Sequence, residues 1–383
     1  MRLVRPDSTT DRIPDRIPDA ITEEDERIFA SVVSVDLEPW QKEQIVSPET
    51  TYPRQGRVLA AHWHPEFVPL ELVSRRLEAL FPNKAEELVI PTQHNELLVF
   101  GPYAGVEVDC YAGRFDQKVQ LLLHFRAERV AEAGVLTSLL AHTYQYRSKQ
   151  LWDFIHAVVG PDESIVSVAA KATGAGSGLV NFVRAYVKRV EELLEKHWSD
   201  VSRDSFKNKL LRNFFNGLRP VYGDSVIDRA QAFLKVVKEQ VKLGFSPTYF
   251  YRVSEVIEEA RSLGGCVVIP HPEQFWPILL ARYDVDGYEV WNPQSRRYTD
   301  FLVDVVTEMN AKSGSGRRIL VFMGDDTHMG EKVKPPALQD PAKAAREIGV
   351  QPAWDDMGLR TRLIFANMSR QAVIREYIER LSA

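Results

Sequence analysis

The sequence predicts an α/β protein in which strands alternate with helices. Short apolar runs, typical of buried strands, recur along the chain, and several are separated by segments with helical periodicity. Alternation of this kind indicates a parallel sheet or a barrel. The pattern breaks between residues 137 and 245, where apolar residues keep helical spacing. We therefore expect an α/β domain that is interrupted by a mainly helical insertion.

The expected strands are apolar runs that are repeatedly followed by histidines. They cover residues 56–62, 87–91, 105–109, 119–124, 265–270, 288–291 and 318–323. Helical periodicity covers residues 70–80 and 254–263, and Gly264 and Gly265 indicate the end of the second helix. Inside the insertion we expect helices at residues 137–159, 179–198, 205–218 and 225–243. In barrels of alternating strands and helices, reactive groups follow the strands, so the histidines indicate a site.

The length of 383 residues suits one large domain with an insertion, or two domains. Residues 1–55 are rich in Asp, Arg, Pro and Glu and include the echo Asp-Arg-Ile-Pro-Asp-Arg-Ile-Pro-Asp at 11–19. This composition is typical of an arm outside the core, so we expect a partly extended N-terminal arm there. The α/β domain then comprises residues 56–136 and 246–383, and the helical insertion comprises residues 137–245.

The bulk composition is that of an ordinary globular protein, with 44% hydrophobic and 26% charged residues. A formal net charge of −5 provides no broad positive field, so we expect no bulk binding of duplex nucleic acid. No apolar run approaches the ~20 residues of a membrane-spanning helix, so we expect no membrane partner. The N-terminus lacks the apolar stretch of a signal peptide, and we expect a cytoplasmic protein. Cys110 and Cys266 lie in apolar runs and are expected as core residues in a reducing compartment.

Six of the nine histidines stand where expected strands end, and two carboxylates accompany them. His62 and His64 are two residues apart, so both rings point to one face of an extended strand, and Asp326 and His328 share this spacing. Neutral imidazole is the commonest ligand of zinc and related ions, and carboxylates add the negative charge that lets two cations lie close together. Either pair alone is more often an ordinary polar strand end. The candidate set is His62, His64, His94, Glu107, His124, His271, Asp326 and His328.

The order of these motifs resembles the PHP (polymerase and histidinol phosphatase) family over roughly residues 56–330. The motifs are His-x-His, Thr-x-His, Gly-Val-Glu, a strand-end His, Gly-Gly-x-x-x-Ile-Pro-His-Pro, Asp-Gly-Tyr-Glu-Val and Gly-Asp-Asp-Thr-His. The resemblance implies a distorted, TIM-like barrel of seven strand-helix units with two or three divalent metal ions (Zn, Mn or Fe) at the C-terminal ends of the strands. It implies metal ligation by all eight residues of the candidate set, with Glu107 bridging two ions.

The chain departs from the family pattern at two places. No histidine follows the first His-x-His, where Glu66 is the nearest acidic residue, and Gln93 stands where the family often has Asp. The choice between two and three bound metal ions therefore stays open. Asp326 is preferred to Asp325 because it alone has the Asp-x-His spacing, and Glu289 is either a ligand or a residue that orients one.

The resemblance implies a metal-dependent hydrolase, most often a phosphoesterase that acts on a small phosphorylated metabolite or a short nucleotide. Metal ions would activate water, and His271 or Asp326 would pass a proton to the leaving oxygen. A metal-dependent amidase or lactonase is an alternative, because metal-activated water also attacks carbonyl groups. A non-catalytic metal-binding protein is the second alternative.

Overall fold

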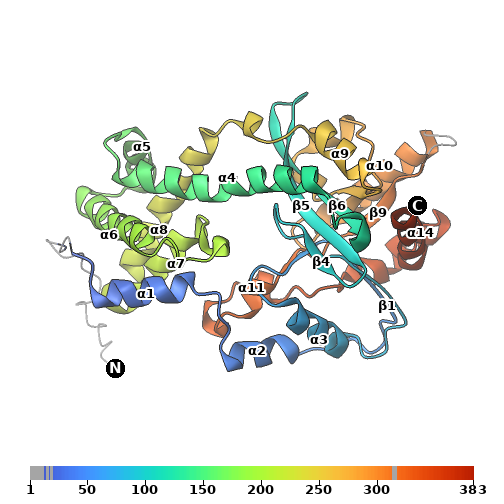
Figure 1. Cartoon of the computed structure of the whole chain (residues 1–383), viewed down its shortest axis with the longest axis horizontal. Helices are drawn as coiled ribbons and strands as arrows, with labels where there is room; N and C mark the ends of the chain where they lie inside the picture. Colours follow the sequence, from blue (N-terminus) through green and yellow to red (C-terminus); the bar gives the residue numbers. More distant parts are fainter. Residues whose placement is uncertain (1–12, 14–16, 18–19, 313–316) are drawn as a thin grey trace, which may run out of the picture. The chain divides into compact units, whose positions relative to one another are not determined.

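The computed structural model describes residues 13, 17, 20–312 and 317–383. The chain divides into two compact units (Figure 1). The helical unit comprises the residues up to 36 and residues 145–246, and the α/β unit comprises residues 37–144 and 247–383. The helical unit thus contains most of the expected insertion and also takes in residues that we expected in the N-terminal arm.

The α/β unit contains a six-stranded sheet and two pairs of short strands. The large sheet has the order β4-β5-β6-β7-β8-β9, in which β4 to β7 are antiparallel to their neighbours and β7 to β9 are parallel. In each small sheet the two strands are parallel: β1 (Arg57–Ala60) pairs with β3 (Glu86–Val89), and β2 (Trp63–His64) pairs with β10 (Thr327–His328). The strands of the large sheet are β4 (Leu98–Phe100), β5 (Tyr103–Ala112), β6 (Gln117–Arg126), β7 (Cys266–Ile269), β8 (Gly287–Trp291) and β9 (Leu320–Met323).

Each of the seven expected strands overlaps a strand of the structure, but their directions differ from a simple alternation of strands and helices. β5 and β6 lie side by side as a long antiparallel pair (Figure 1). A parallel connection needs a dozen or more residues, whereas only residues 113–116 join these strands, with Asp116 at φ 51°. Because the described strands form three separate sheets, the closed barrel of seven units stays a prediction.

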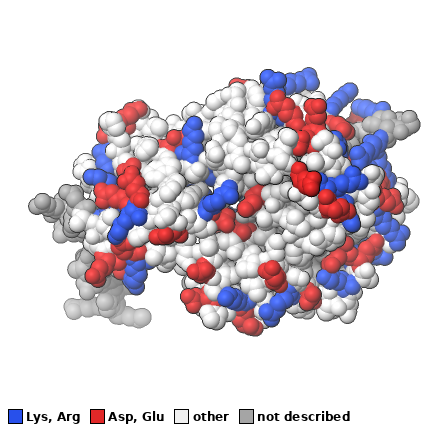
Figure 2. All heavy atoms as spheres, in the orientation of Figure 1, with Lys and Arg blue, Asp and Glu red and all other residues white. Residues whose placement is uncertain are grey.

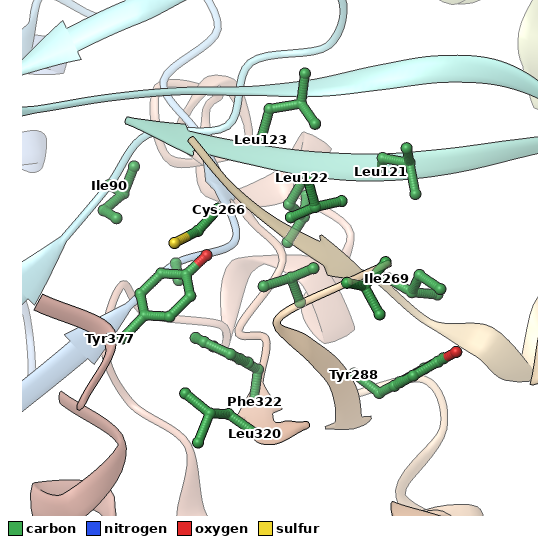
Figure 3. Packing of buried hydrophobic residues seen from close by; sticks show 14 of the residues in the cluster. Ile90, Leu121, Leu122, Leu123, Cys266, Ile269, Tyr288, Leu320, Phe322 and Tyr377 are labelled. Carbon is green, nitrogen blue, oxygen red and sulfur yellow. The ribbon is translucent and has the colours of Figure 1, made fainter. Parts of the chain in front are cut away.

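Helices pack on the strands of the α/β unit through faces with helical spacing. α14 buries Val373, Ile374, Tyr377 and Leu381, and the Tyr377 ring lies beside Phe322 of β9 with ring centroids 4.8 Å apart (Figure 3). The expected helices at residues 70–80 and 254–263 are confirmed as α3 and α9. The helices of this unit are α2 (Pro39–Val46), α3 (Leu70–Leu80), α9 (Val253–Ser262), α10 (Thr299–Lys312), α11 (Met329–Lys332), α12 (Pro341–Ala344), α13 (Met357–Phe365) and α14 (Arg370–Ser382).

The helical unit has a hydrophobic core of its own. α6 buries Phe182, Val183, Val187 and Val190 along one face, and the expected helices of the insertion are all present. α8 is bent at Gly223, whose φ of 77° interrupts the helical backbone. The helices of the helical unit are α1 (Glu23–Val33), α5 (Ser164–Thr173), α6 (Ser177–Lys196), α7 (Lys209–Gly217) and α8 (Arg219–Leu243), with the second part of α4 (Gly134–Val159).

Much of the described part of residues 1–55, where we expected a partly extended arm, is helical. α1 and α2 lie there, and Thr22 caps α1 through a reciprocal pair of hydrogen bonds with Asp25. Ile28 and Phe29 of α1 are buried, and Asp25 forms a buried ion pair with Arg189 of α6 at 2.9 Å. We did not predict these helices from the sequence, because their few apolar residues stand among many charged ones. The echo at residues 11–19 lies almost wholly outside the described residues.

The surface and the cysteines agree with an ordinary globular composition. Acidic and basic side chains are interspersed on the face drawn in Figure 2. Cys110 and Cys266 are both buried and form no disulfide. Among the helices that the structure describes, none is both long enough and apolar enough to cross a membrane.

Candidate metal centre

Three overlapping groups of side chains bring together seven of the eight predicted ligands. Within each group, one possible ligand atom from each residue lies within 4.8 Å of the others. Side chains as far as 264 residues apart in sequence, such as those of His64 and His328, meet here, and all belong to the α/β unit. The groups are His64 with His94 and His328, His62 with His64 and Asp326, and His62 with Glu107 and His271.

The strand pairing places the histidines. His62 and His64 follow β1, and β2 pairs with β10 so that His64 lies opposite His328, with ring centroids 4.3 Å apart. His94 forms an isolated bridge with Glu107 of β5, and its ring stacks on His64 at 4.3 Å. His271 follows the end of the parallel strand β7. Segments at the ends of strands that pair in parallel therefore supply most of the candidate ligands, whereas Glu107 lies in the antiparallel strand β5.

The carboxylate of Glu107 lies between the groups. It is buried, and its Oε1 lies 3.3 Å from Nε2 of His271 and 3.7 Å from Nε2 of His62. Its Oε2 contacts Nδ1 of His94 and lies 3.8 Å from Nε2 of His64. Because the two oxygens face different histidines, this side chain has the arrangement that a carboxylate needs to bridge two cations.

Asp326 presents one oxygen to the histidines, and other residues hold the second oxygen. Oδ1 lies 3.4 Å from Nε2 of His64 and 3.5 Å from Nε2 of His328. Oδ2 accepts hydrogen bonds from Arg346 at 2.7 Å and Gln294 at 3.0 Å. These contacts fix which oxygen faces the site. Neither Arg346 nor Gln294 belongs to a recognisable motif, and we did not predict them.

The neighbouring Asp325 faces other partners. Its Oδ2 accepts hydrogen bonds from the backbone N–H of Gly349 at 2.9 Å and from Gln351 at 3.2 Å, and its Oδ1 accepts one from the N–H of Thr327. The preference for Asp326 over Asp325 therefore agrees with the directions of the two carboxylates. Burial raises the pKa of Asp325 to about 7.

Glu289 of β8 contacts the ring nitrogen of His62 that faces away from Glu107 and Asp326. Its Oε2 lies 3.0 Å from Nδ1 of His62, and it also accepts a hydrogen bond from the backbone N–H of His271 at 3.0 Å. Asn292 donates to the other oxygen at 3.0 Å. A proton on Nδ1 of His62 leaves Nε2 free to face Glu107 and Asp326, which is the usual way in which a carboxylate sets the tautomer of a metal-binding histidine.

Unpartnered nitrogen atoms show that the residues fit divalent metal ions. Nε2 of His62 and both ring nitrogens of His64 are buried and make no hydrogen bond in the described part of the chain. A buried polar atom without a partner costs roughly 1–3 kcal/mol, so such atoms in a native site usually have a ligand. Imidazoles with two carboxylates are a donor set that suits zinc, manganese and iron.

The charges around the site favour the protonation states that ligands need. Although burial by itself raises the pKa of Glu107, the surrounding His94 and His271 hold that pKa well below its usual value. The pKa of Asp326 is also held low, because His328 and His64 outweigh the effect of burial. Burial, together with His94 and His328, lowers the pKa of His64 well below its usual value. The two carboxylates are thus ionised and His64 is neutral.

His62 differs from His64. Burial lowers the pKa of its imidazole, but Glu289, Glu107 and Asp326 outweigh this effect and raise the pKa to about 10. Without a cation, His62 therefore carries a proton on each nitrogen at neutral pH. A metal ion that uses Nε2 has to replace one of these protons.

Two glycines leave the space that the acidic side chains occupy. A Cβ atom at Gly324 would lie 1.9 Å from Oε1 of Glu289 and 2.9 Å from Nδ1 of His62. A Cβ atom at Gly330 would lie 2.1 Å from Oε2 of Glu66. Glu66, at φ 53°, points its Oε1 toward Nδ1 of His328 at 3.5 Å. It therefore lies at the edge of the ligand groups, where sequence reasoning left its role open.

His124 is the predicted ligand that the structure does not bring into the groups. Its Nδ1 forms a 2.8 Å hydrogen bond with the hydroxyl of Tyr377, and burial lowers its pKa to about 3. Because β6 is antiparallel to β7, His124 pairs with Cys266 at the start of β7, whereas His271 follows the end of that strand. Nε2 of His124 is buried and makes no hydrogen bond in the described part of the chain, so ligation by His124 stays a prediction.

Comparisons with known proteins add little beyond the geometry. No family model and no curated protein matches the chain. The chain is similar to a solved structure from Bifidobacterium adolescentis, which is described as that of a "putative metal-dependent phosphoesterase". It is 19% identical, with a TM-score of 0.39, and the match covers 74% of this chain and 90% of that one.

Proposed function

We propose that the chain is a metal-dependent hydrolase, and more narrowly a phosphoesterase that acts on a small phosphorylated metabolite or a short nucleotide. The observation that carries the proposal is the convergence of five histidines and two carboxylates with unpartnered nitrogens directed among them. The narrower assignment is supported by the order of motifs that resembles the PHP family. Structural sites for one ion usually close with four ligands, and this set is larger.

The residues that would hold divalent ions are His62, His64, His94, Glu107, His271, Asp326 and His328. Ions bound there would lower the pKa of a water molecule and offset negative charge on phosphoryl oxygens. Glu107 would share its two oxygens between neighbouring groups, and Glu289 and Arg346 would hold His62 and Asp326 in place. We do not include His124 among these ligands.

The contacts separate the two residues that we considered as proton donors. The carboxyl of Asp326 is held ionised by His328 and His64, and its second oxygen accepts hydrogen bonds from Arg346 and Gln294. It therefore suits a ligand better than an acid. For His271, burial lowers the pKa, but Glu107 outweighs this effect and raises it. His271 is therefore the better candidate for proton transfer to the leaving oxygen, and in that role it would donate its proton instead of ligating an ion, which leaves the other six residues to hold the ions.

The test combines metal analysis with a substrate panel. The purified protein is analysed for bound metals and is assayed on an aryl phosphate, nucleotides, an aryl amide and a lactone, with and without added manganese or zinc. We expect metal-dependent hydrolysis of phosphate esters that His62→Ala and Asp326→Ala abolish. His156→Ala is the matched control, because this histidine is exposed in the helical unit.

Each other outcome selects a different function. Turnover of the amide or lactone without turnover of phosphate esters would replace the phosphoesterase by an amidase or lactonase. Bound metal without turnover of any substrate would favour a non-catalytic metal-binding protein. A folded protein that binds no metal even when metal is supplied would refute the metal centre itself.

A further inference from the structure

A polar pocket lies in the α/β unit, at the opposite end of β1 from the candidate metal centre. Its volume is 790 Å³, and residues 51–57 and segments of residues 354–371 line it. Arg57 begins β1, whereas His62 and His64 follow its last residue. None of the seven residues of the metal centre lines this pocket. The pocket is therefore a separate place for a ligand.

Positive charge dominates the lining. Arg54, Arg57, Arg360 and Arg370 line the pocket together with a single carboxylate, that of Asp355. Asp355 pairs with Arg370 at 3.3 Å, and Arg57 pairs with Glu86 at 3.1 Å. Arg54 and Arg360 have no carboxylate partner within 4.0 Å among the residues that the structure describes. Four guanidinium groups around one pocket repel one another, and an anion between them relieves that repulsion.

Two buried donors at the pocket lack partners. Nε of Arg370 and Nε1 of Trp354 are buried and make no hydrogen bond in the described part of the chain. Trp354 is 4% exposed. Burial lowers the pKa of Arg370, and the nearby Arg360 and Arg57 lower it further, while Asp355 opposes them. The Nη atoms of Arg370 donate to the backbone carbonyl of Arg57 and to Asp355, both at 3.3 Å, so the guanidinium is held in place at the pocket.

The N-terminus of α14 adds partial positive charge to the pocket. Ser369 caps this 13-residue helix by accepting a hydrogen bond from the N–H of Ala372, and Ser369, Arg370 and Gln371 all line the pocket. The first N–H groups of a helix point out of its N-terminus and carry partial positive charge. Arginine side chains and a helix N-terminus together are the usual elements of a phosphate site.

We propose that this pocket binds a small ligand that carries phosphate groups. The planar guanidinium fork matches phosphate oxygens in pairs, and the volume falls within the range of roughly 300–1,000 Å³ that is usual for small-molecule sites. The pocket is independent of the proposed catalytic site, because its residues contribute nothing to the metal groups. It is a binding site, and no bond is made or broken in it.

The test measures binding of inorganic pyrophosphate by isothermal titration calorimetry. The protein is used as purified and, in a second arm, after treatment with a chelator, so that binding to metal ions is distinguished from binding to arginines. We expect binding in both arms. The double variant Arg54→Gln/Arg360→Gln should weaken it by roughly tenfold or more, because each charge-assisted hydrogen bond to phosphate contributes substantially to affinity. Both arginines are exposed, so the variant should fold.

Arg75→Gln is the matched control, because Arg75 is also exposed but lies on α3 outside the pocket. We expect its affinity for pyrophosphate to equal that of the unchanged protein. The proposal is overturned if the double variant binds as tightly as the control, or if binding disappears after chelation. Tighter binding of citrate than of pyrophosphate in the same pocket would overturn the assignment to phosphate.

Discussion

At the scale of single residues, the metal centre depends on side chains that hold the ligands as much as on the ligands. Glu289 contacts Nδ1 of His62 at 3.0 Å and also accepts the backbone N–H of His271. One carboxylate thus orients two candidate ligands from two parts of the chain. Removal of such a partner typically weakens metal binding without removing a ligand.

We predict that Glu289→Gln lowers metal affinity by roughly 10- to 100-fold while the protein still folds. The amide keeps the shape of the side chain but loses the charge that stabilises the His62 tautomer. Competition with a chromogenic chelator measures the change. Glu308→Gln, at an exposed glutamate of α10, should leave the affinity unchanged. Equal affinities in the two variants would show that Glu289 has no such role.

Metal binding should release protons, and its affinity should rise with pH. The pKa of His62 in the metal-free protein is raised to about 10, so its imidazole is protonated at neutral pH, and a cation that uses Nε2 displaces a proton. Raising the pH toward 10 therefore removes the competing proton and strengthens binding. Calorimetry at pH 7 in two buffers with different ionisation enthalpies measures the released protons. Binding without proton release would contradict this protonation state of His62.

At the scale of secondary-structure elements, the pairing of the strands distinguishes two histidines that look alike in the sequence. His124 and His271 both follow apolar runs, and both look alike as strand-end histidines. The antiparallel pairing of β6 with β7 puts these two residues at opposite ends of β7. The four-residue connection between β5 and β6 makes these two strands antiparallel, because it is too short for a parallel crossover.

We predict that His124→Leu keeps the full metal content but lowers the free energy of unfolding by about 1–3 kcal/mol, because the Tyr377 hydroxyl loses its buried partner. Tyr377→Phe should be destabilising by a similar mechanism, again with unchanged metal content. Urea unfolding and elemental analysis of the same samples provide the two measurements. Loss of a metal ion from folded His124→Leu protein would restore His124 as a ligand.

At the scale of the whole molecule, the chain contains two cores with different architectures. The α/β unit holds the metal centre and the arginine-lined pocket, and the helical unit has its own hydrophobic core. The first helix of the chain belongs to the helical unit, and the Asp25–Arg189 ion pair joins it to α6 there. Both side chains of this pair are almost completely buried.

We predict that Asp25→Ala destabilises the helical unit by roughly 3 kcal/mol or more, since it leaves Arg189 buried without this carboxylate. It also removes the acidic half of the α1 capping pair. Scanning calorimetry should show a lower transition temperature, while metal content stays unchanged because every residue of the centre lies in the other unit. A variant that loses its metal in the folded state would show that the two units are coupled.

The sequence by itself determined the local features of this protein. Seven of the described strands, the helices α3, α4, α6, α7, α8 and α9, and the residue types of the candidate metal centre follow from apolar periodicity and from spacings such as His62-x-His64 and Asp326-x-His328. Strands β2, β4 and β10 and helices α5 and α10 to α14 were not expected. The helices α1 and α2 were not predicted, because their apolar residues are few among many charged ones. The site could be predicted as far as short motifs reach.

Only the tertiary structure decided strand direction and the contacts of Glu289, Arg346 and Gln294 with the candidate ligands. It also brought residues 51–57 and 354–371 together into the arginine-lined pocket. The physical reason is the difference between local and long-range interactions. Periodicity and spacing act over a few residues of one segment, whereas the direction of a strand and the approach of distant segments depend on the packing of the whole core.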